Sequence, residues 1–458
     1  MAIIKVQKQL FGTNGVRGIA GKDMTPELAL NIGKALGTMR PGKIAVGRDT
    51  RTTGPVLINA LKAGLLATGC DVIDCGILPT PALQYIVKEH YDCGAMITAS
   101  HNPPEYNGVK IIEPDGTEMG DEEIILLEDL LSDKTVPFKS WDLVGTEVSA
   151  PHLVDEYIHA IASRFPEKPG KGMTVVVDPG SGPACHTTPA ILQALGCRVI
   201  TINGVMDGTF PGRLPEPSPE GLKGLAALVL ANNAAFGVAH DGDADRAVFV
   251  DNNGVFVEEN QEFALFAQYI CQNATGTIVT PVSTSLLIEM IAETAGCTVT
   301  YTPVGSIYVA RKMRELIETG NTVIFGGEGN GGLIFPDHQF CRDGGMTAAT
   351  LVLLLATSDK SFSSLLSALP QRRMIKEKIK TPYGLQLIEQ LNKKYAQESV
   401  DHTDGLKLKR NRTWALIRAS GTEPLVRVMV DAEDSKTGLA LFEEIENSVS
   451  EILKKISH

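Results

Sequence analysis

Three aspartates alternate along one short segment of the chain, Asp241, Asp243 and Asp245, between two apolar runs. In an extended segment, alternate side chains point the same way, so the three carboxylates are expected to converge. Three like charges need a cation, and hard oxygen ligands favour Mg²⁺. An EF-hand is excluded because its sixth position would be Arg246 instead of Gly and its twelfth Asn252 instead of Glu. The pattern predicts a magnesium site, with an acidic surface turn as the alternative.

A serine that could carry a phosphoryl group is Ser100, in Thr-Ala-Ser-His-Asn-Pro. A helix-capping serine is the alternative. The G-x-S-x-G signature of a hydrolase elbow is absent. Because the chain also carries the three aspartates and a phosphate-type loop, a phosphorylated Ser100 is favoured, and its oxygen could complete the Mg²⁺ shell.

The phosphate-type loop is Arg-Ala-Ser-Gly-Thr-Glu-Pro, beginning at Arg418. Arg418 supplies charge, Ser420 and Thr422 supply hydroxyl donors, and Gly421 permits close backbone approach. An ordinary strand-turn-strand connection is the alternative.

Two further groups could contact a sugar or an anion. Glu328 and Asn330 are spaced by glycines, and their side chains can accept from and donate to sugar hydroxyls; a flexible glycine turn is the alternative. Arg17 and Arg48 lie near predicted strand ends, where either could bind an anion or be only a surface charge.

The elements that must position these residues repeat along the chain. An apolar strand, a loop, a helix and a Gly-Cys pair recur three times, with the pairs at Gly69-Cys70, Gly196-Cys197 and Gly296-Cys297. Glycine suits the left-handed residue that closes a helix, and the Val/Ile runs suit buried parallel strands. Each unit is followed by another apolar strand and one of the polar loops described above. Ligands gather at the carboxyl ends of such strands, so we expect the loops to form one composite site.

The sequence therefore predicts an α/β protein with three similar α/β/α domains that contain mixed sheets, plus a smaller C-terminal α+β domain, around a central cleft. The expected boundaries are 1–150, 151–253, 254–369 and 370–458. In the last domain we expect helices at 385–395 and 438–455 and strands at 413–418 and 425–430.

Composition excludes several classes of protein. The 54 acidic and 42 basic residues give a net charge of −12, which argues against a general nucleic-acid binder. No segment reaches the roughly 18 apolar residues of a membrane span, and the N-terminus does not read as a signal peptide, so we expect a cytoplasmic protein that binds no membrane. The eight cysteines show no C-x-x-C spacing and are expected to be free thiols that are mostly buried.

Taken together in this order, the motifs resemble those of the α-D-phosphohexomutases over essentially the whole chain. The start motif Phe-Gly-Thr-Asn-Gly-Val-Arg-Gly and the Glu-Gly-Asn-Gly-Gly loop most resemble archaeal-type phosphoglucosamine mutases, whose relatives are phosphomannomutase/phosphoglucomutases. The sugar loop often reads Glu-x-Ser-Gly-His in relatives, so Asn330 replaces a serine here. Thr-Pro-Val-Gly-Ser, ending at Ser306, lacks the basic residue that many sugar-phosphate mutases carry.

The resemblance implies an isomerase that interconverts glucosamine 6-phosphate and glucosamine 1-phosphate through a phosphoserine and a 1,6-bisphosphate, which also serves as activator. It implies that Ser100 carries the phosphoryl group and that the three aspartates bind one Mg²⁺ per chain. It places Arg246, His101, Lys110 and Arg17 beside the reacting groups, with Lys110 as the candidate for proton transfer.

Alternatives stay open at this point. The sugar could be glucose or mannose, and the protein could be a Mg²⁺-dependent sugar phosphatase or a non-catalytic sugar-phosphate sensor. Its partners are expected to be small sugar phosphates, and the chain to act as a monomer or homodimer.

Overall fold

The computed structural model describes residues 10–12, 15–132, 136, 138–420 and 424–456. The chain forms two compact units. The first contains Met1–Glu258 and Asn330–Leu365, and the second contains Glu259–Gly329 and Leu366–His458. Each is described by itself.

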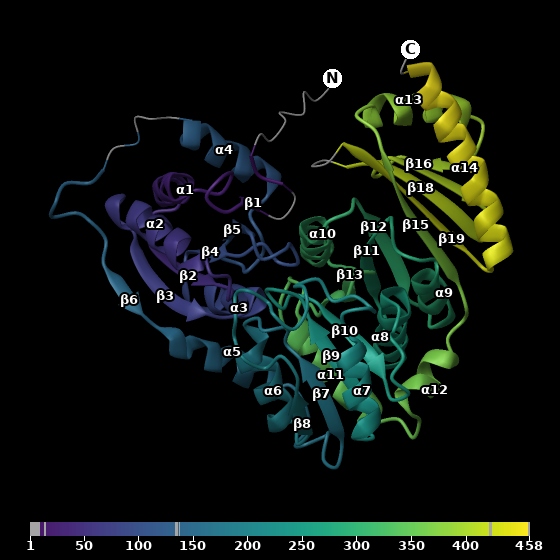
Figure 1. Ribbon diagram of the computed structural model, residues 1–458, viewed down its shortest axis with the longest axis horizontal. Helices are drawn as coiled ribbons and strands as arrows, with labels where there is room; N and C mark the ends of the chain where they lie inside the picture. The colour runs from purple at the N-terminus through teal and green to yellow at the C-terminus, as the bar shows by residue number, and fades with distance from the viewer. Residues whose placement is uncertain (1–9, 13–14, 133–135, 137, 421–423, 457–458) are drawn as a thin grey trace. The chain divides into compact units, whose positions relative to one another are not determined.

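The first unit begins with a six-stranded mixed sheet in the order β1-β5-β4-β2-β3-β6 (Figure 1). Strand β2 pairs in parallel with β3 and β4, whereas β5 runs antiparallel to β1 and β4. Since β2 and β4 are parallel neighbours, the loops after them emerge at the same edge. The strands are β1 (Val16–Ile19), β2 (Lys43–Arg48), β3 (Asp71–Ile77), β4 (Cys93–Ile97), β5 (Tyr106–Ile112) and β6 (Glu147–Ser149). The helices are α1 (Pro26–Met39), α2 (Gly54–Ala67), α3 (Thr80–His90) and α4 (Asp121–Ser132).

The second sheet of this unit has the order β10-β9-β7-β8. Strands β7, β8 and β9 are parallel and β10 is antiparallel to β9. Its strands are β7 (Thr174–Asp178), β8 (Arg198–Thr201), β9 (Phe236–His240) and β10 (Ala247–Asp251). Its helices are η1 (Pro151–Leu153), α5 (Val154–Ala162), α6 (Ala184–Ala194) and α7 (Lys223–Ala231). Two later elements belong to the same unit, β14 (Gly332–Ile334) and α11 (Gly344–Ala356), and α11 packs against α5 and α6.

The second unit carries the third α/β arrangement. Strand β11 (Thr277–Pro281) pairs in parallel with β12 (Thr298–Thr302) and β13 (Val323–Glu328). The helices that connect and flank these strands are α8 (Glu259–Asn273), α9 (Leu287–Thr294) and α10 (Ser306–Glu318). Helix α12 (Phe362–Ser367) begins in the first unit and ends in the second, where the chain continues into the C-terminal part.

The C-terminal part is an antiparallel sheet in the order β15-β19-β18-β17-β16. Its strands are β15 (Arg373–Lys380), β16 (Val400–Asp401), β17 (Leu406–Arg410), β18 (Thr413–Ala419) and β19 (Leu425–Ala432). Helices α13 (Gly384–Lys394) and α14 (Ser435–Ile456) cover it with apolar faces that include Leu387, Leu391, Ile445 and Val449. The two strands and two helices predicted here are confirmed, with ends within a few residues.

The repeat in the sequence corresponds to a repeated helix end. Gly69, Gly196 and Gly296 follow α2, α6 and α9 with φ of +86°, +90° and +71°, a region that glycine enters without steric cost. The cysteine after each glycine is buried, as are all the free thiols except Cys185, which is partly exposed. The predicted fold class, three α/β/α domains with mixed sheets and a C-terminal α+β domain, is confirmed, while the exact domain limits stay a prediction.

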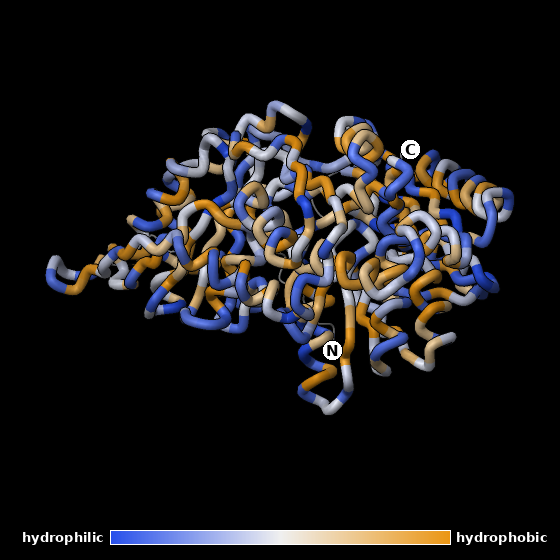
Figure 2. Tube along the Cα trace, turned by 90° about the horizontal axis from the view of Figure 1, so that it is seen from below, coloured by the Kyte–Doolittle hydropathy of each residue, from blue (hydrophilic) through white to orange (hydrophobic). Residues whose placement is uncertain are grey.

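Hydrophobic residues are spread along the chain and are not concentrated in one helix or strand (Figure 2). Along the chain in Figure 2, hydrophobic and hydrophilic residues alternate within short distances. Among the described residues, no helix combines the length and apolar character that crossing a membrane would require.

Candidate active site

Ser100 lies in the loop after β4, at the edge where the parallel strands end. Its side chain is fully buried, and its backbone has φ of +50°, in the left-handed region that residues other than glycine seldom enter. The Thr98 hydroxyl accepts a hydrogen bond from the Ser100 backbone N–H over 2.9 Å. Ser100 Oγ donates to Asp241 Oδ2 over 2.7 Å, so the serine loop and the aspartate loop meet.

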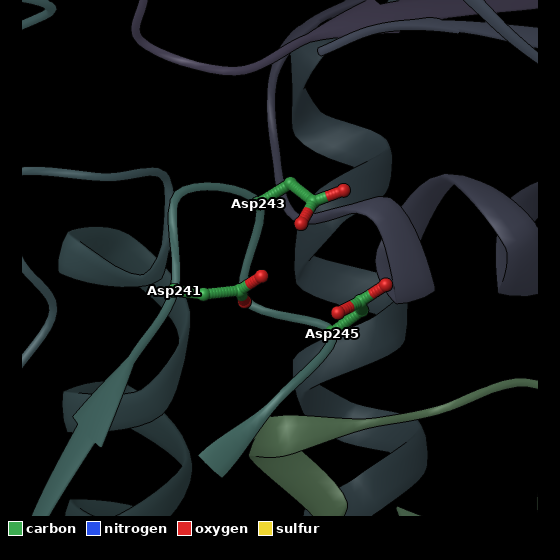
Figure 3. A group of neighbouring side chains, drawn as sticks. All are labelled: Asp241, Asp243 and Asp245. Atoms are coloured by element: carbon green, nitrogen blue, oxygen red, sulfur yellow. The ribbon is translucent and has the colours of Figure 1, made fainter. Parts of the chain in front are cut away.

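The three aspartates follow β9 and converge as predicted. Each offers a carboxylate oxygen within 4.8 Å of the others, and all three side chains are buried (Figure 3). The predicted reason was wrong, because the segment is a turn instead of an extended strand. The Ala244 N–H donates to the Asp241 carbonyl over 3.2 Å, and Ala244 has φ of +57°. The backbone therefore wraps around the point where the carboxylates meet.

The aspartates differ in their electrostatic surroundings. Burial, together with the charges of Asp245 and Asp243, raises the pKa of Asp241 to about 8. Burial opposes ionisation of Asp243, but the charge and hydrogen bond of Lys110, the hydrogen bond of Thr80 and the charge of Arg17 together outweigh it and hold the pKa of Asp243 below its ordinary value. The Oδ1 atoms of Asp243 and Asp245 are buried and accept no hydrogen bond from the described residues. Buried carboxylate oxygens left over in this way fit a metal site.

Lys110, on β5, is a cation in direct contact with this cluster. Its Nζ lies 2.8 Å from Asp243 Oδ2 and 3.3 Å from Asp245 Oδ2, and 3.9 Å from Glu118 Oε1. Burial opposes the charge, but these three carboxylates raise the pKa of Lys110 above its ordinary value. The ammonium is therefore protonated at neutral pH.

The other predicted residues of the first unit lie around the same loops. Arg17 Nη1 donates to the Ala99 carbonyl over 3.4 Å and to Asn102 Oδ1 over 3.2 Å. Arg246 Nη2 lies 3.1 Å from His101 Nδ1. Burial and the charges of Arg246 and Arg17 lower the pKa of His101 to about 2, so its imidazole is neutral.

Two residues of this cluster were not predicted. The Thr80 hydroxyl donates to Asp243 Oδ2 over 2.6 Å, and Arg342 donates to Asp245 Oδ2. Thr80 follows a strand end in Leu-Pro-Thr-Pro, a signal that could have been recognised. Arg342 is a single arginine in a loop and carries no such signal.

The predicted sugar and phosphate residues are distributed over both units. Asn330 belongs to the first unit, and its Oδ1 accepts from the Gly332 N–H over 3.1 Å. Glu328 ends β13 in the second unit and is buried. Arg418, on β18, pairs with Asp404 at 2.7 Å, and the Ser420 N–H donates to the Leu425 carbonyl over 2.9 Å. Gly421 and Thr422 lie outside the described residues. Whether these groups act on one substrate with Ser100 stays a prediction.

Comparison with known proteins identifies the family. Four domain models of phosphoglucomutase/phosphomannomutase match in order: the α/β/α domains I, II and III at residues 8–136, 155–254 and 258–373, and the C-terminal domain at 374–448.

Individual relatives agree over almost their whole length. A phosphoglucomutase/phosphomannomutase of Thermococcus kodakarensis is 43% identical, with 95% of this chain and 99% of the relative covered. A phosphoglucosamine/phosphogalactosamine mutase of Sulfurisphaera tokodaii is 39% identical, with 98% and 99% covered. A solved phosphoglucomutase/phosphomannomutase family protein of Burkholderia thailandensis is 27% identical and superimposes with a TM-score of 0.85, covering 96% of this chain and 98% of that one. The chain belongs to the phosphoglucomutase/phosphomannomutase family of phosphohexomutases and is an isomerase.

Proposed function

We propose that this phosphohexomutase is a phosphoglucosamine mutase that acts through a phosphorylated Ser100. The observation that carries the phosphoserine is the 2.7 Å hydrogen bond from Ser100 Oγ to Asp241 Oδ2, beside a cluster of three buried carboxylates. Phosphoryl transfer is catalysed mainly by positioning and by neutralising charge, and a hydroxyl next to a cation-binding cluster provides both.

We assign one Mg²⁺ to Asp241, Asp243 and Asp245, with the Ser100 oxygen or its phosphate as a further ligand. The supporting observations are the all-oxygen donor set and the two buried Oδ1 atoms without hydrogen bonds within the described part of the chain. When bound, the ion neutralises charge on the transferring phosphate.

The surrounding side chains are assigned proton transfer, positive charge and hydrogen bonding. Lys110, protonated beside Asp243, is assigned to give a proton to an oxygen that leaves phosphorus. Arg17 and Arg246 supply positive charge near the Ser100 loop, and neutral His101, held by Arg246, can donate or accept a hydrogen bond.

The proposed reaction has two transfers. Phosphorylated Ser100 gives its phosphoryl group to the free 1-hydroxyl of glucosamine 6-phosphate: the bond from phosphorus to Ser100 Oγ breaks, and a bond to the sugar oxygen forms. Lys110 gives a proton to the released Oγ, and the proton that the 1-hydroxyl loses restores the ammonium. The 1,6-bisphosphate turns over, and its 6-phosphoryl group passes to Ser100, which leaves the 1-phosphate. The same bisphosphate serves as activator, because it can phosphorylate a bare Ser100.

The predicted sugar and phosphate residues are assigned the part of the substrate that does not react. Arg418, Ser420, Gly421 and Thr422 would hold the phosphate that is not transferring. Glu328 and Asn330 would bind the 3- and 4-hydroxyls, which exchange places when the intermediate turns. Those hydroxyls are shared by glucosamine, glucose and mannose, so this loop selects weakly among the sugars.

The choice of glucosamine is supported by the 39% identical relative named a phosphoglucosamine/phosphogalactosamine mutase. An alternative, phosphomannomutase/phosphoglucomutase activity, is favoured by the 43% identical relative that carries that name. Measuring kcat/KM for the 6-phosphates of glucosamine, glucose and mannose, each with its matching bisphosphate, separates the two. We expect glucosamine 6-phosphate to be best; a preference for either other sugar above tenfold, about 1.4 kcal/mol, would favour the alternative.

The same assay tests the two other classes. A sugar phosphatase would release inorganic phosphate without needing bisphosphate, and a sensor would bind sugar phosphate without turnover. The cytoplasmic location and the monomeric or homodimeric state stay predictions.

A further inference from the structure

A buried arginine, Arg51, lies in the loop after β2, next to the loop that carries Ser100. A guanidinium has five N–H donors, and all five are used. Nε donates to Asp49 Oδ2 over 3.0 Å. The two Nη groups donate to three backbone carbonyls of the serine loop and to that of Tyr106, the first residue of β5. The acceptors are Ser100, Asn102, Pro103 and Tyr106, over 2.7, 2.7, 2.6 and 2.9 Å.

The remaining faces of Arg51 are also occupied. The guanidinium lies 5.3 Å from the centroid of the Phe210 ring, and the side chain has no solvent-exposed surface. With every donor engaged and no access to solvent, Arg51 cannot bind a substrate phosphate without breaking this network. Arg17 and Arg246, in contrast, are partly exposed.

Asp49 and Thr98 complete the connection from Arg51 to Ser100. Asp49 Oδ2 accepts from the Thr98 hydroxyl over 2.7 Å as well as from Arg51. The Thr98 hydroxyl oxygen in turn accepts from the Ser100 N–H over 2.9 Å. The backbone of Ser100 is therefore held at both ends, at its N–H through Thr98 and at its carbonyl by Arg51.

This support is needed because Ser100 has φ of +50°. A serine released from these hydrogen bonds would leave the left-handed region, which L-residues other than glycine enter at a steric cost. Its Oγ would then move away from Asp241.

We propose that Arg51, through Asp49 and Thr98, is a positioning residue that holds Ser100 in its left-handed conformation and so aims Oγ at the carboxylate cluster. The inference rests on the proposed function of Ser100 as the phosphoryl carrier. It assigns Arg51 to the transfer step and not to substrate binding.

The test uses the full-length enzyme with Mg²⁺ and the variant Arg51→Lys, which keeps the charge but offers three donors for five acceptors. A misplacement of the reacting atom by about 1 Å can cost a hundredfold in rate, so we expect kcat to fall about a hundredfold while KM stays within about threefold. Phosphorylation of Ser100 by glucose 1,6-bisphosphate, followed by intact mass, should slow by a similar factor.

A second pair of variants makes a smaller change and tests the proposal even if Arg51→Lys does not fold. Thr98→Val removes the hydroxyl that binds the Ser100 N–H, and Thr98→Ser restores it. Valine should lower kcat and slow phosphorylation, and serine should recover both. Lys62→Met is the matched control in the same domain. It breaks two partly buried ion pairs, with Asp74 and Glu147 at 2.8 and 2.7 Å, away from the serine loop, so its effect should be on melting temperature and not on kcat.

The outcomes separate the inference from the proposed function. If wild-type Ser100 takes up no phosphate, the proposed function fails. If wild type is phosphorylated and active but Arg51→Lys and Thr98→Val keep the wild-type kcat and phosphorylation rate, or if Arg51→Lys raises KM alone, the positioning role of Arg51 is overturned.

Discussion

Ser100 Oγ and Asp241 Oδ2 lie 2.7 Å apart although 141 residues separate them in the chain. The contact joins the loops after β4 and β9, and Gly242 makes room for it. A Cβ on Gly242 would lie 2.3 Å from the Ser100 carbonyl oxygen, closer than any side chain can approach backbone. The two loops therefore fit together only because glycine follows Asp241.

Gly242→Ala should separate the two loops. We expect kcat to fall by about a hundredfold, since the reacting oxygen shifts by about 1 Å, while overall folding is retained. Steady-state kinetics and circular dichroism measure the two effects. Gly221→Ala is a suitable control for a glycine substitution away from the site, since Gly221 is exposed and a Cβ there has its nearest atom at 3.5 Å, an ordinary contact. Wild-type kcat in Gly242→Ala would show that the contact is not required.

Ser100→Ala should abolish mutase turnover, by at least about a thousandfold, because the proposed phosphoryl carrier is lost. The wild-type protein should gain about 80 Da on incubation with bisphosphate, the mass of one phosphoryl group, and the variant should gain none. A Ser100→Ala enzyme that turns over at the wild-type rate would disprove the assignment.

Asp243→Asn should weaken Mg²⁺ binding by about tenfold or more, since one of three ligand charges is lost. Calorimetric titration with Mg²⁺ measures this independently of turnover. Asp142→Asn, at an exposed position, removes the same charge away from the site and should leave Mg²⁺ affinity unchanged. Equal affinities in wild type and Asp243→Asn would mean that the aspartate turn is not the metal site.

Much of the fold could be predicted from the sequence because its signals are local. Buried parallel strands such as β7 and β9 are continuous apolar runs, and the glycine after each repeated helix marks its end. The aspartate cluster was found for the same reason, since all three ligands lie within five consecutive residues. The turn that gathers them was missed because nothing in the sequence predicts a left-handed alanine at Ala244.

What the sequence did not predict depends on contacts between distant segments. Thr80 and Arg342 reach the aspartates from 163 and 97 residues away, and one threonine or arginine has no periodic pattern. Arg51 is a stronger example, because an arginine in a loop usually lies at the surface. Its burial follows from four carbonyls that come together only when β2 and β4 pair.

Lys407 should give the second unit a pH-dependent stability. It is buried, its Nζ donates to the Val282 carbonyl over 2.7 Å, and it lies 4.3 Å from the Trp414 ring centroid. Burial lowers the pKa of Lys407 to about 8, against about 10.4 in an unfolded chain. Between these values the unfolded chain binds more protons, so stability rises with pH. The melting temperature of wild type relative to Lys407→Met should increase from pH 8 to about pH 10; a constant difference would contradict the shift.

Arg418→Ala should raise KM more than it lowers kcat, because its proposed partner is the phosphate that does not react and is bound equally before and during transfer. A charge-assisted contact is worth roughly 1.5–3 kcal/mol, so we expect KM to rise about ten- to hundredfold.

Asp404 Oδ2 lies 2.7 Å from Arg418 Nε and 3.0 Å from the Val304 N–H, so it fixes the guanidinium beside the loop after β12. Asp404→Asn keeps an oxygen for Val304 but weakens the ion pair, so its KM should rise less than that of Arg418→Ala. Arg412→Ala, at an exposed arginine in the turn between β17 and β18, is the charge-matched control and should leave KM unchanged. If kcat alone collapses in Arg418→Ala, Arg418 serves the transferring phosphate instead.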